Sequence, residues 1–222
     1  AIFANIVLGD EINRASPKTQ AALLESMEER QVTVDGITYQ LGVPFMVIAT
    51  QNPIEYEGTY PLPEAQRDRF MLELAIGYPT RQAEIEILET HGRTTTLLAE
   101  LKPVADAPTV AGMIDDCKTV HVADTLKRYI VDLVRATRDH ADLALGASPR
   151  AALALLRSAR AAGAVAGRDY VVPDDVKELV TPVLAHRLIT APEAQMIGRT
   201  AADVLADIVE YVPIPIRGRD QG

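Results

Sequence analysis

The sequence of 222 residues contains a single cysteine, Cys117, and so excludes an internal disulfide. It has no apolar run long enough for a membrane-spanning helix, and no basic-then-apolar leader precedes its first apolar segment. Positive charge is scarce as well, since 22 Lys and Arg residues stand against 31 Asp and Glu residues and the net charge is −9. That balance disfavours nonspecific binding to nucleic acid or to an anionic membrane. We therefore expect a protein of the reducing cytoplasm, without a membrane segment.

The composition is that of an ordinary globular protein, with 48% hydrophobic and 24% charged residues in a chain long enough for one large domain or two small ones. Short apolar runs predict three strands of a parallel sheet, buried on both faces, at residues 5–8, 45–50 and 70–77. Residues 17–30 predict a crossover helix, because Pro17 suits a first turn and apolar residues gather on one face. The Asp35-Gly36 pair predicts a β-hairpin over residues 31–41.

From Tyr78 onward the pattern indicates one helix after another. Apolar residues at helical spacing predict helices at residues 80–91, 108–117, 122–140, 149–166, 173–188 and 193–211. We expect Pro182 to kink or break the fifth of these helices. The predicted domains are therefore a β-containing part over residues 1–77, an all-helical part over 78–213 and a loose tail over 214–222.

Two adjacent carboxylates, Asp10 and Glu11, follow the first predicted strand. Open parallel sheets bind ligands at the carboxyl ends of their strands, so chemistry is expected at this place. Apolar residues followed by Asp-Glu form a Walker B pattern, in which the Asp holds Mg²⁺ and the Glu orients or deprotonates the water that attacks a γ-phosphate. The alternative is that Asp10 caps the next turn and Glu11 is merely solvated.

Four further polar residues are candidates for the same chemistry. Asn52 follows the second predicted strand, where its amide can bond a phosphate and the attacking water, although Asn-Pro alone is a common turn. Arg67 and Arg69 end a short predicted helix, where a guanidinium either complements the helix dipole or reaches a phosphate. Ser148 is a predicted N-cap, and Arg150 in the first turn opposes the dipole, which favours an anion there over a simple ion pair with an Asp.

The order of these signals resembles that of AAA+ ATPases, and four segments resemble the MoxR family closely. The segments are DEINRASPKTQAALLESMEERQVTVDG, PFMVIATQNPIEYEGTYPLPEAQRDRF, GASPRAALALL and GRDYVVPDDVKELVTPVLAHRL. The resemblance covers nearly the whole chain. It implies an α/β fold, a partial AAA+ P-loop-type parallel sheet with helices, followed by an all-helical lid domain.

The resemblance also implies ATP and Mg²⁺ as cofactors and a role for each candidate. Asp10 and Glu11 would be the Walker B acids, with Asp10 binding the metal and Glu11 catalytic, and Asn52 would be the catalytic residue called sensor 1. Arg69 would be the arginine finger, a catalytic residue offered to a neighbouring subunit, and Arg150 would be the nucleotide-binding residue called sensor 2.

Two departures from the family pattern qualify these roles. Arg67 stands where the family more usually has Leu, so the finger is either Arg67 or Arg69. No G-x-x-x-x-G-K-[ST] motif occurs in the sequence, and GRTTTLL at residues 92–98 lacks the Lys. Since the sequence opens on AIFANIVLGD without Met, we expect the P-loop and the first strands of the sheet to precede residue 1.

By the same resemblance, residues 31–41 would be the pre-sensor-1 hairpin.

The implied function is an ATP-hydrolysing chaperone that remodels or activates client protein complexes. It would act as an oligomeric ring, a hexamer by this resemblance, beside a partner that bears a von Willebrand factor A domain. The sequence does not name the client. A DNA-translocating AAA+ helicase is one alternative, but a hairpin that grips DNA needs Lys or Arg, and residues 31–41 contain neither. We therefore expect no nucleic acid partner. A non-catalytic interaction module is the other alternative, if the P-loop is truly absent.

We predict that this chain alone hydrolyses no ATP, because the grip on the β- and γ-phosphates comes mainly from the backbone N–H groups and Lys of a P-loop. The candidate acids and arginines only order water and neutralise charge. An ATPase assay of the purified chain tests this expectation. Robust turnover that the substitution Glu11→Gln abolishes would show that the nucleotide site lies elsewhere.

Overall fold

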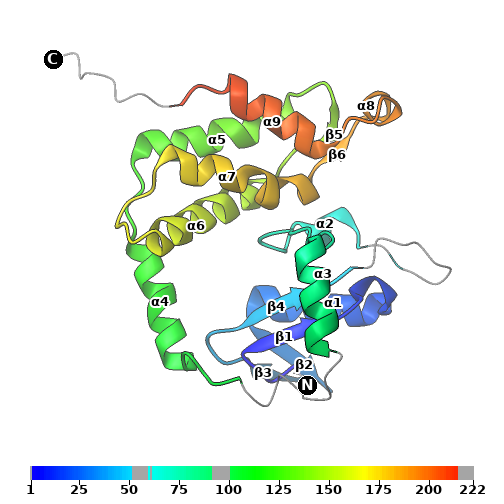
Figure 1. The fold of residues 1–222 in the computed structure, drawn as a ribbon, viewed down its shortest axis with the longest axis vertical. Helices are drawn as coiled ribbons and strands as arrows, with labels where there is room; N and C mark the ends of the chain where they lie inside the picture. The colour runs from blue at the N-terminus through cyan, green and yellow to red at the C-terminus, as the bar shows by residue number, and fades with distance from the viewer. Residues whose placement is uncertain (1, 52–59, 61, 92–100, 215–222) are drawn as a thin grey trace.

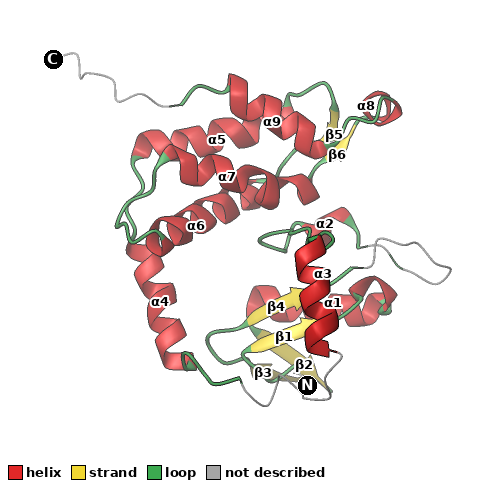
Figure 2. Ribbon diagram, viewed as in Figure 1, coloured by secondary structure: helices red, strands yellow, loops and turns green. Residues whose placement is uncertain are grey.

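The computed structural model describes residues 2–51, 60, 62–91 and 101–214 of the chain. Figure 2 shows two parts, one that holds most of the strands together with a few helices, and one that is built mainly of helices. The described residues begin in the first part and end in the second (Figure 1).

Two parallel strands confirm the first two predicted strands. β1 (Ile6–Gly9) pairs with β4 (Met46–Ala49), with Ile6 opposite Met46 and Gly9 opposite Ala49. Parallel strands need a long crossover, which a helix and a hairpin between them supply. The predicted burial on both faces is wrong for one face, because Ile6 is 64% and Leu8 66% exposed within the described structure.

The crossover helix α1 (Pro17–Glu29) forms where it is predicted. Pro17 occupies its first turn, and the Ser16 hydroxyl accepts a hydrogen bond from a backbone N–H of that turn at 3.3 Å. The helix ends at Arg30, whose backbone is left-handed with φ of 51°. Glu28 therefore lies in the last turn of α1.

The predicted hairpin is confirmed as β2 (Gln31–Val34) paired antiparallel with β3 (Ile37–Gln40). At its turn, Asp35 has φ of 51° and Gly36 has φ of 78°. A type I′ turn requires positive φ at both central residues, which Asp-Gly provides at little cost.

No strand forms over residues 70–77, so the third predicted strand is wrong. A strand exists only as part of a ladder, and among the described residues no strand pairs with this segment. Instead, the backbone N–H of Glu73 donates to the carbonyl of Pro182 at 2.9 Å, and the side chain of Ile76 is 96% exposed. The apolar run supplies the tendency to pair, but a partner strand decides the outcome.

Helices make up most of the remaining described chain. They are α2 (Glu64–Arg67), α3 (Arg81–His91), α4 (Ala107–Thr119), α5 (Asp124–Arg138), α6 (Pro149–Val165), α7 (Pro173–Leu184), α8 (Pro192–Met196) and α9 (Ala201–Tyr211). The last predicted helix divides into α8 and α9 around Gly198, whose φ of 74° lies outside the helical region. A short antiparallel pair, β5 (Leu143–Leu145) with β6 (Ile189–Thr190), is added to the helical part. Within the described ranges, no helix is both long and apolar enough to cross a membrane.

The helical part contains the larger core. In α5 the residues at helical spacing, Leu126, Ile130, Leu133 and Val134, are all buried and pack with Leu155 of α6. Figure 1 shows α5, α6, α7 and α9 as neighbouring helices of this part. Each large apolar side chain that is fully buried contributes about 1.5–3 kcal/mol, so this core dominates the stability of the helical part.

The end of α7 sets the position of a short turn that is important below. Pro182 lies inside α7, and the helix ends two residues later, at Leu184, so the predicted break falls slightly beyond the proline. Proline lacks an N–H and crowds the preceding turn, which favours an end nearby. The chain continues directly into the 3-10 turn η3 (Ala185–Arg187).

A close backbone approach fixes the start of α6. A Cβ at Gly146 would lie 2.6 Å from Cα of Arg138 and 2.7 Å from the carbonyl of Thr137, so only glycine fits there. The next residue, Ala147, donates its N–H to the Thr137 hydroxyl at 2.9 Å. The end of α5 thus determines where Ser148 and the first turn of α6 are placed.

Candidate functional site

The carboxyl ends of β1 and β4 are joined through Thr50, which directly follows β4. The Thr50 hydroxyl donates to Oδ1 of Asp10 at 2.6 Å and accepts a hydrogen bond from the backbone N–H of Glu11 at 2.8 Å. The N–H of Ile12 donates to the Thr50 carbonyl at 2.9 Å. These bonds hold the two predicted Walker B acids together at the sheet edge where open parallel sheets bind ligands.

Glu11 has a backbone conformation that is uncommon for a residue other than glycine. Its φ and ψ are 46° and 54°, in the left-handed region, which costs roughly 1–3 kcal/mol. Such a conformation persists only where surrounding contacts fix it, and the bonds through Thr50 do so here. The Glu11 carboxylate lies 3.1 Å from Nε of Arg14 in the 3-10 turn η1 (Ile12–Arg14) and stays partly exposed. A strained and partly exposed acid is typical of a functional site.

Two residues that support this edge were missed by the sequence analysis. Thr50 occupies the position after its strand that Asp10 occupies after β1, and this equivalence was an available signal. Gln20 is buried and donates to the carbonyls of Ile12 and Tyr60, each at 3.1 Å. No local sequence signal marks Gln20, because these partners lie 8 and 40 residues away.

The donors at this edge suit a metal that arrives with a phosphate ligand. Across the described ranges, no group of three or more His, Cys, Asp or Glu side chains forms a metal site. Mg²⁺ is commonly held by one or two carboxylates, by water and by substrate phosphates, without a full protein cage. The exposed carboxylate of Asp10 therefore fits Mg²⁺ bound together with a nucleotide. Asn52, the predicted sensor 1, lies outside the described residues.

The two other predicted nucleotide-binding residues meet at one carboxylate. Arg69, which follows α2, and Arg150, in the first turn of α6, both form ion pairs with Glu28 at the end of α1. Arg150 also lies 3.8 Å from Asp68. The three side chains of this cluster remain about a third to a half exposed. Ion pairs with that exposure contribute only about 0–1 kcal/mol, so another anion can displace Glu28.

Arg67, the alternative finger, is placed differently from Arg69. Its Nε is buried and has no hydrogen-bond partner within the described residues. The guanidinium of Arg69 is instead held at a partly exposed carboxylate. This difference favours Arg69 as the residue that meets an external anion.

The candidate residues thus fall into two groups that are held by different contacts. Asp10 and Glu11 precede α1 in the sequence, whereas Glu28, with Arg69 and Arg150, lies in its last turn. The acids do not lie at the start of α1, because a Cβ at Gly9 would be 3.5 Å from Cδ2 of Leu23, in the middle of the helix. Thr50 and Arg14 hold the acids, whereas Glu28 holds the two arginines.

A buried joint links the segment that carries Arg69 to the helical part. The Arg187 guanidinium, whose side chain is 2% exposed, donates to Oδ1 of Asp68 at 2.9 Å. The Ser148 hydroxyl donates to the two oxygens of the same carboxylate, at 3.2 and 3.0 Å. Ser148 is the N-cap residue of α6 as predicted, but its side chain makes no capping bond. Asp68 therefore binds both η3 and the start of α6.

His186, beside Arg187, is a neutral member of the joint. The pKa of His186 is lowered from 6.5 to about 4. Burial is the larger cause, and the positive charge of Arg187 is the second. Its Nε2 lies 3.1 Å from the carbonyl of Phe70. Because a carbonyl only accepts, we assign the proton of the neutral ring to Nε2.

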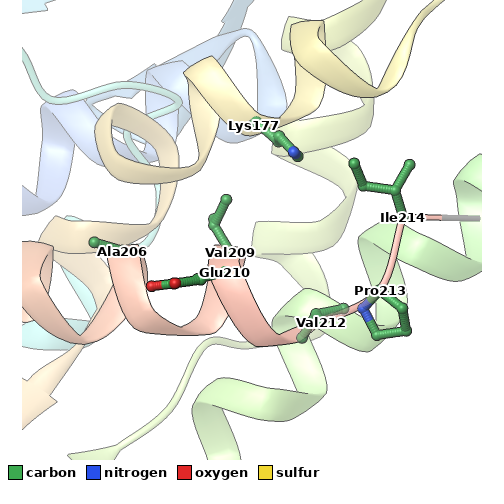
Figure 3. Close-up of a pocket in the computed structure, with 7 residues that line it drawn as sticks. All are labelled: Lys177, Ala206, Val209, Glu210, Val212, Pro213 and Ile214. Carbon is green, nitrogen blue, oxygen red and sulfur yellow. The ribbon is translucent and has the colours of Figure 1, made fainter.

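A shallow hollow of about 700 Å³ lies elsewhere, between α7 and α9 (Figure 3). Its lining is mostly apolar and consists of Lys177, Ala206, Val209, Glu210, Val212, Pro213 and Ile214. It contains none of the predicted site residues. A nucleotide phosphate needs several donors, so we place the functional site at the sheet edge and not in this hollow.

Comparison with known proteins identifies the family. Residues 1–72 match the model of the ATPase family associated with various cellular activities (AAA), and residues 135–208 match that of the AAA lid domain. The chain is 46% identical to YeaC of Bacillus subtilis over 97% of this chain and 67% of YeaC. It is 41% identical to chaperone MoxR1 of Mycobacterium tuberculosis over 96% of this chain and 58% of MoxR1. The chain belongs to the MoxR family of AAA+ ATPases.

A solved structure agrees with this assignment. The crystal structure of a candidate ATPase from Cytophaga hutchinsonii matches with a TM-score of 0.90 and 38% identity, over 96% of this chain and 67% of that one. The predicted AAA+ α/β fold is confirmed, and family membership implies the use of ATP and Mg²⁺ in general. The MoxR-family chain spans between 58% and 67% of the length of these relatives.

The joint predicts a pH dependence of stability that His186 controls. Its pKa is about 4 in the folded chain and 6.5 in the unfolded chain, so the unfolded chain takes up a proton first as the pH falls. The contribution of neutral His186 to the free energy of unfolding is complete above pH 6.5 and is lost as the pH falls from 6.5 to 4. At pH 5 the loss is roughly 2 kcal/mol. Urea unfolding at pH 7, 6 and 5 measures this loss.

The variant His186→Gln should lose less stability than the wild type over that interval, because Gln keeps a donor for Phe70 and does not titrate. His121→Gln, at an exposed histidine, is the matched control and should follow the wild type. Parallel curves for the wild type and His186→Gln would contradict the assignment of a buried neutral imidazole.

Proposed function

We propose that this chain is the Walker B, arginine-finger and lid portion of an ATP-hydrolysing chaperone that remodels or activates client protein complexes. The observation that carries the proposal is the sheet edge, where Thr50 holds Asp10 and Glu11 side by side in a chain of the MoxR family. The similarity to a relative named chaperone MoxR1 supports the chaperone role.

The proposed mechanism gives each group at the edge one task. Asp10 binds Mg²⁺ through its exposed carboxylate, and Glu11 orients the attacking water and accepts its proton. Mg²⁺, when bound together with ATP, would neutralise the negative charge of the γ-phosphoryl group. Thr50 positions both acids, since its hydroxyl bonds the Asp10 carboxylate and the Glu11 backbone. Asn52 is proposed as sensor 1 on its sequence position.

We infer that Arg69 and Arg150 act together on the nucleotide of a neighbouring subunit. Both bind Glu28, whereas the acids of the same chain are held by Thr50 and Arg14. Two partly exposed guanidinium groups that already share one anion are suited to share a phosphate. Such a contact in trans requires an oligomer, and a closed ring, proposed here as a hexamer, gives every subunit the same contact.

The hairpin supports a protein client over DNA. At its tip, Val34 and Ile37 are exposed apolar residues beside the acidic Asp35, and residues 31–41 contain no Lys or Arg. Apolar exposure favours contact with protein, whereas a grip on phosphate needs cations. A von Willebrand factor A domain partner is proposed on the family resemblance alone.

The first test is the catalytic acid. In the full-length protein, Glu11→Gln should leave ATP binding nearly intact and lower turnover by roughly 10²-fold or more, because a positioned base is lost. Asp10→Asn should instead weaken Mg²⁺-dependent binding. ATPase kinetics and nucleotide titration measure both effects, and Glu178→Gln, at an exposed acid of α7, is the control. Near-normal turnover in Glu11→Gln would remove the basis of the proposal.

The second test concerns the arginines. Arg69→Ala and Arg150→Ala should each lower turnover, and for the finger Arg69 the loss should be ~10³-fold without weaker nucleotide binding by a single subunit. Arg67→Ala should matter less. When Arg69→Ala subunits are mixed with Glu11→Gln subunits, turnover should return, because the second kind still offers its Arg69 to the intact acids of the first. No recovery on mixing would show that the arginines do not act in trans.

A further inference from the structure

Arg187 is a buried cation whose contacts surround the position of Arg69. Its guanidinium donates to the carboxylate and the carbonyl of Asp68 at 2.9 and 3.2 Å, and to the carbonyls of Phe70 and Met71 at 2.5 and 3.3 Å. One further bond reaches the carbonyl of Val183 in α7. The five N–H groups of the guanidinium therefore have five acceptors. Four of these acceptors lie in residues 68–71.

The same joint continues to the helix that carries Arg150. The carboxylate of Asp68 accepts hydrogen bonds from Arg187 and from Ser148, the N-cap residue of α6. Arg150, two residues further on, lies 3.8 Å from the second oxygen of Asp68. The His186 ring adds a contact with the Phe70 carbonyl. Segment 68–71, η3 and the start of α6 are thus connected through buried or half-buried polar contacts.

We propose that Arg187 is a positioning residue that fixes Arg69 and Arg150 relative to each other, so that the two arginines are presented to a neighbouring subunit as one rigid unit of the lid. The inference rests on the proposed function. Arg69 lies between residues whose carbonyls Arg187 binds, so its position depends on η3. A lid movement therefore carries the finger with it, although Arg69 lies far from α6 in the sequence.

Lysine cannot replace Arg187 in this role. An ammonium group keeps the positive charge that Asp68 needs, but it has three donors on one atom and no planar fork. Arg187→Lys therefore retains the charge of the joint and loosens segment 68–71. A displacement of about 1 Å at a group that must meet a transition state costs ~10²-fold in rate.

The test uses mixed assemblies of the full-length protein, in which the finger donor and the nucleotide-bearing acceptor are different subunits. Glu11→Gln subunits serve as donors, and Arg69→Ala subunits as acceptors. Arg187→Lys is placed first in the donor and then in the acceptor. We expect the restored turnover to fall by ~10²-fold in the donor placement, with the KM for ATP unchanged, and to stay within about twofold in the acceptor placement.

This asymmetry separates positioning from a structural role, because a general loss of folding or assembly would reduce turnover in both placements. Arg199→Lys is the matched control, since Arg199 forms ion pairs with Asp142 and Asp207 away from the joint. It should leave both placements unchanged. Equal losses in the two placements, or no loss in either, would overturn the inference.

A milder variant covers the case in which Arg187→Lys does not assemble. Asp68→Asn keeps an acceptor for Arg187 and nearly the same volume, and it should give the same asymmetry with a severalfold loss. A symmetric effect of Asp68→Asn would equally overturn the inference. If the unmodified donor and acceptor recover no turnover, the proposed function fails, and this inference fails with it. The two failures can be told apart, because failure of the proposed function already shows as no recovery of turnover before Arg187 or Asp68 is changed.

Discussion

The carboxylate of Asp68 is the contact on which the arrangement of the two parts depends. It neutralises the buried guanidinium of Arg187 and accepts hydrogen bonds from Ser148. Removing one partner of a buried pair leaves an uncompensated charge, which typically costs 3–5 kcal/mol, so the joint resists partial opening. The segment after α2 therefore follows the helical part. Figure 1 shows α2 between the strands and the large helices, where this joint lies.

The position of Glu28 in α1 bears on how a complete nucleotide site would form. The acids of β1 precede this helix, and Glu28 in its last turn holds Arg69 and Arg150. If the arginines of every subunit act on the nucleotide held by the acids of its neighbour, complete sites arise only where two subunits meet. Glu28 then acts as a temporary partner that keeps two like charges together before a phosphate arrives. Because Glu28 is partly exposed, exchanging it for another anion costs little free energy, in contrast to Asp68, whose side chain is only 19% exposed.

Local patterns predicted well where the chain itself supplies the partner. The Asp-Gly turn of the hairpin, the start of α1 at Pro17 and the buried face of α5 depend on near neighbours, and all three are confirmed. The strand over residues 70–77 failed because a ladder partner is not encoded locally. The meeting of Arg150 with Glu28, across 122 residues, had no local signal either. The sequence indicated which charged residues belong to the site. Only the fold showed that the acids and the arginines are held by different partners.

The most direct measurement is a structure of the assembled full-length protein with Mg²⁺ and a non-hydrolysable ATP analogue. The account predicts that Arg69 and Arg150 of one subunit leave Glu28 and lie within hydrogen-bonding distance of the γ-phosphate held at Asp10 and Glu11 of the next subunit. It also predicts that Arg187 still binds Asp68 in every subunit. A structure in which Arg150 reaches the nucleotide of its own chain, while Arg69 remains on Glu28, would contradict it.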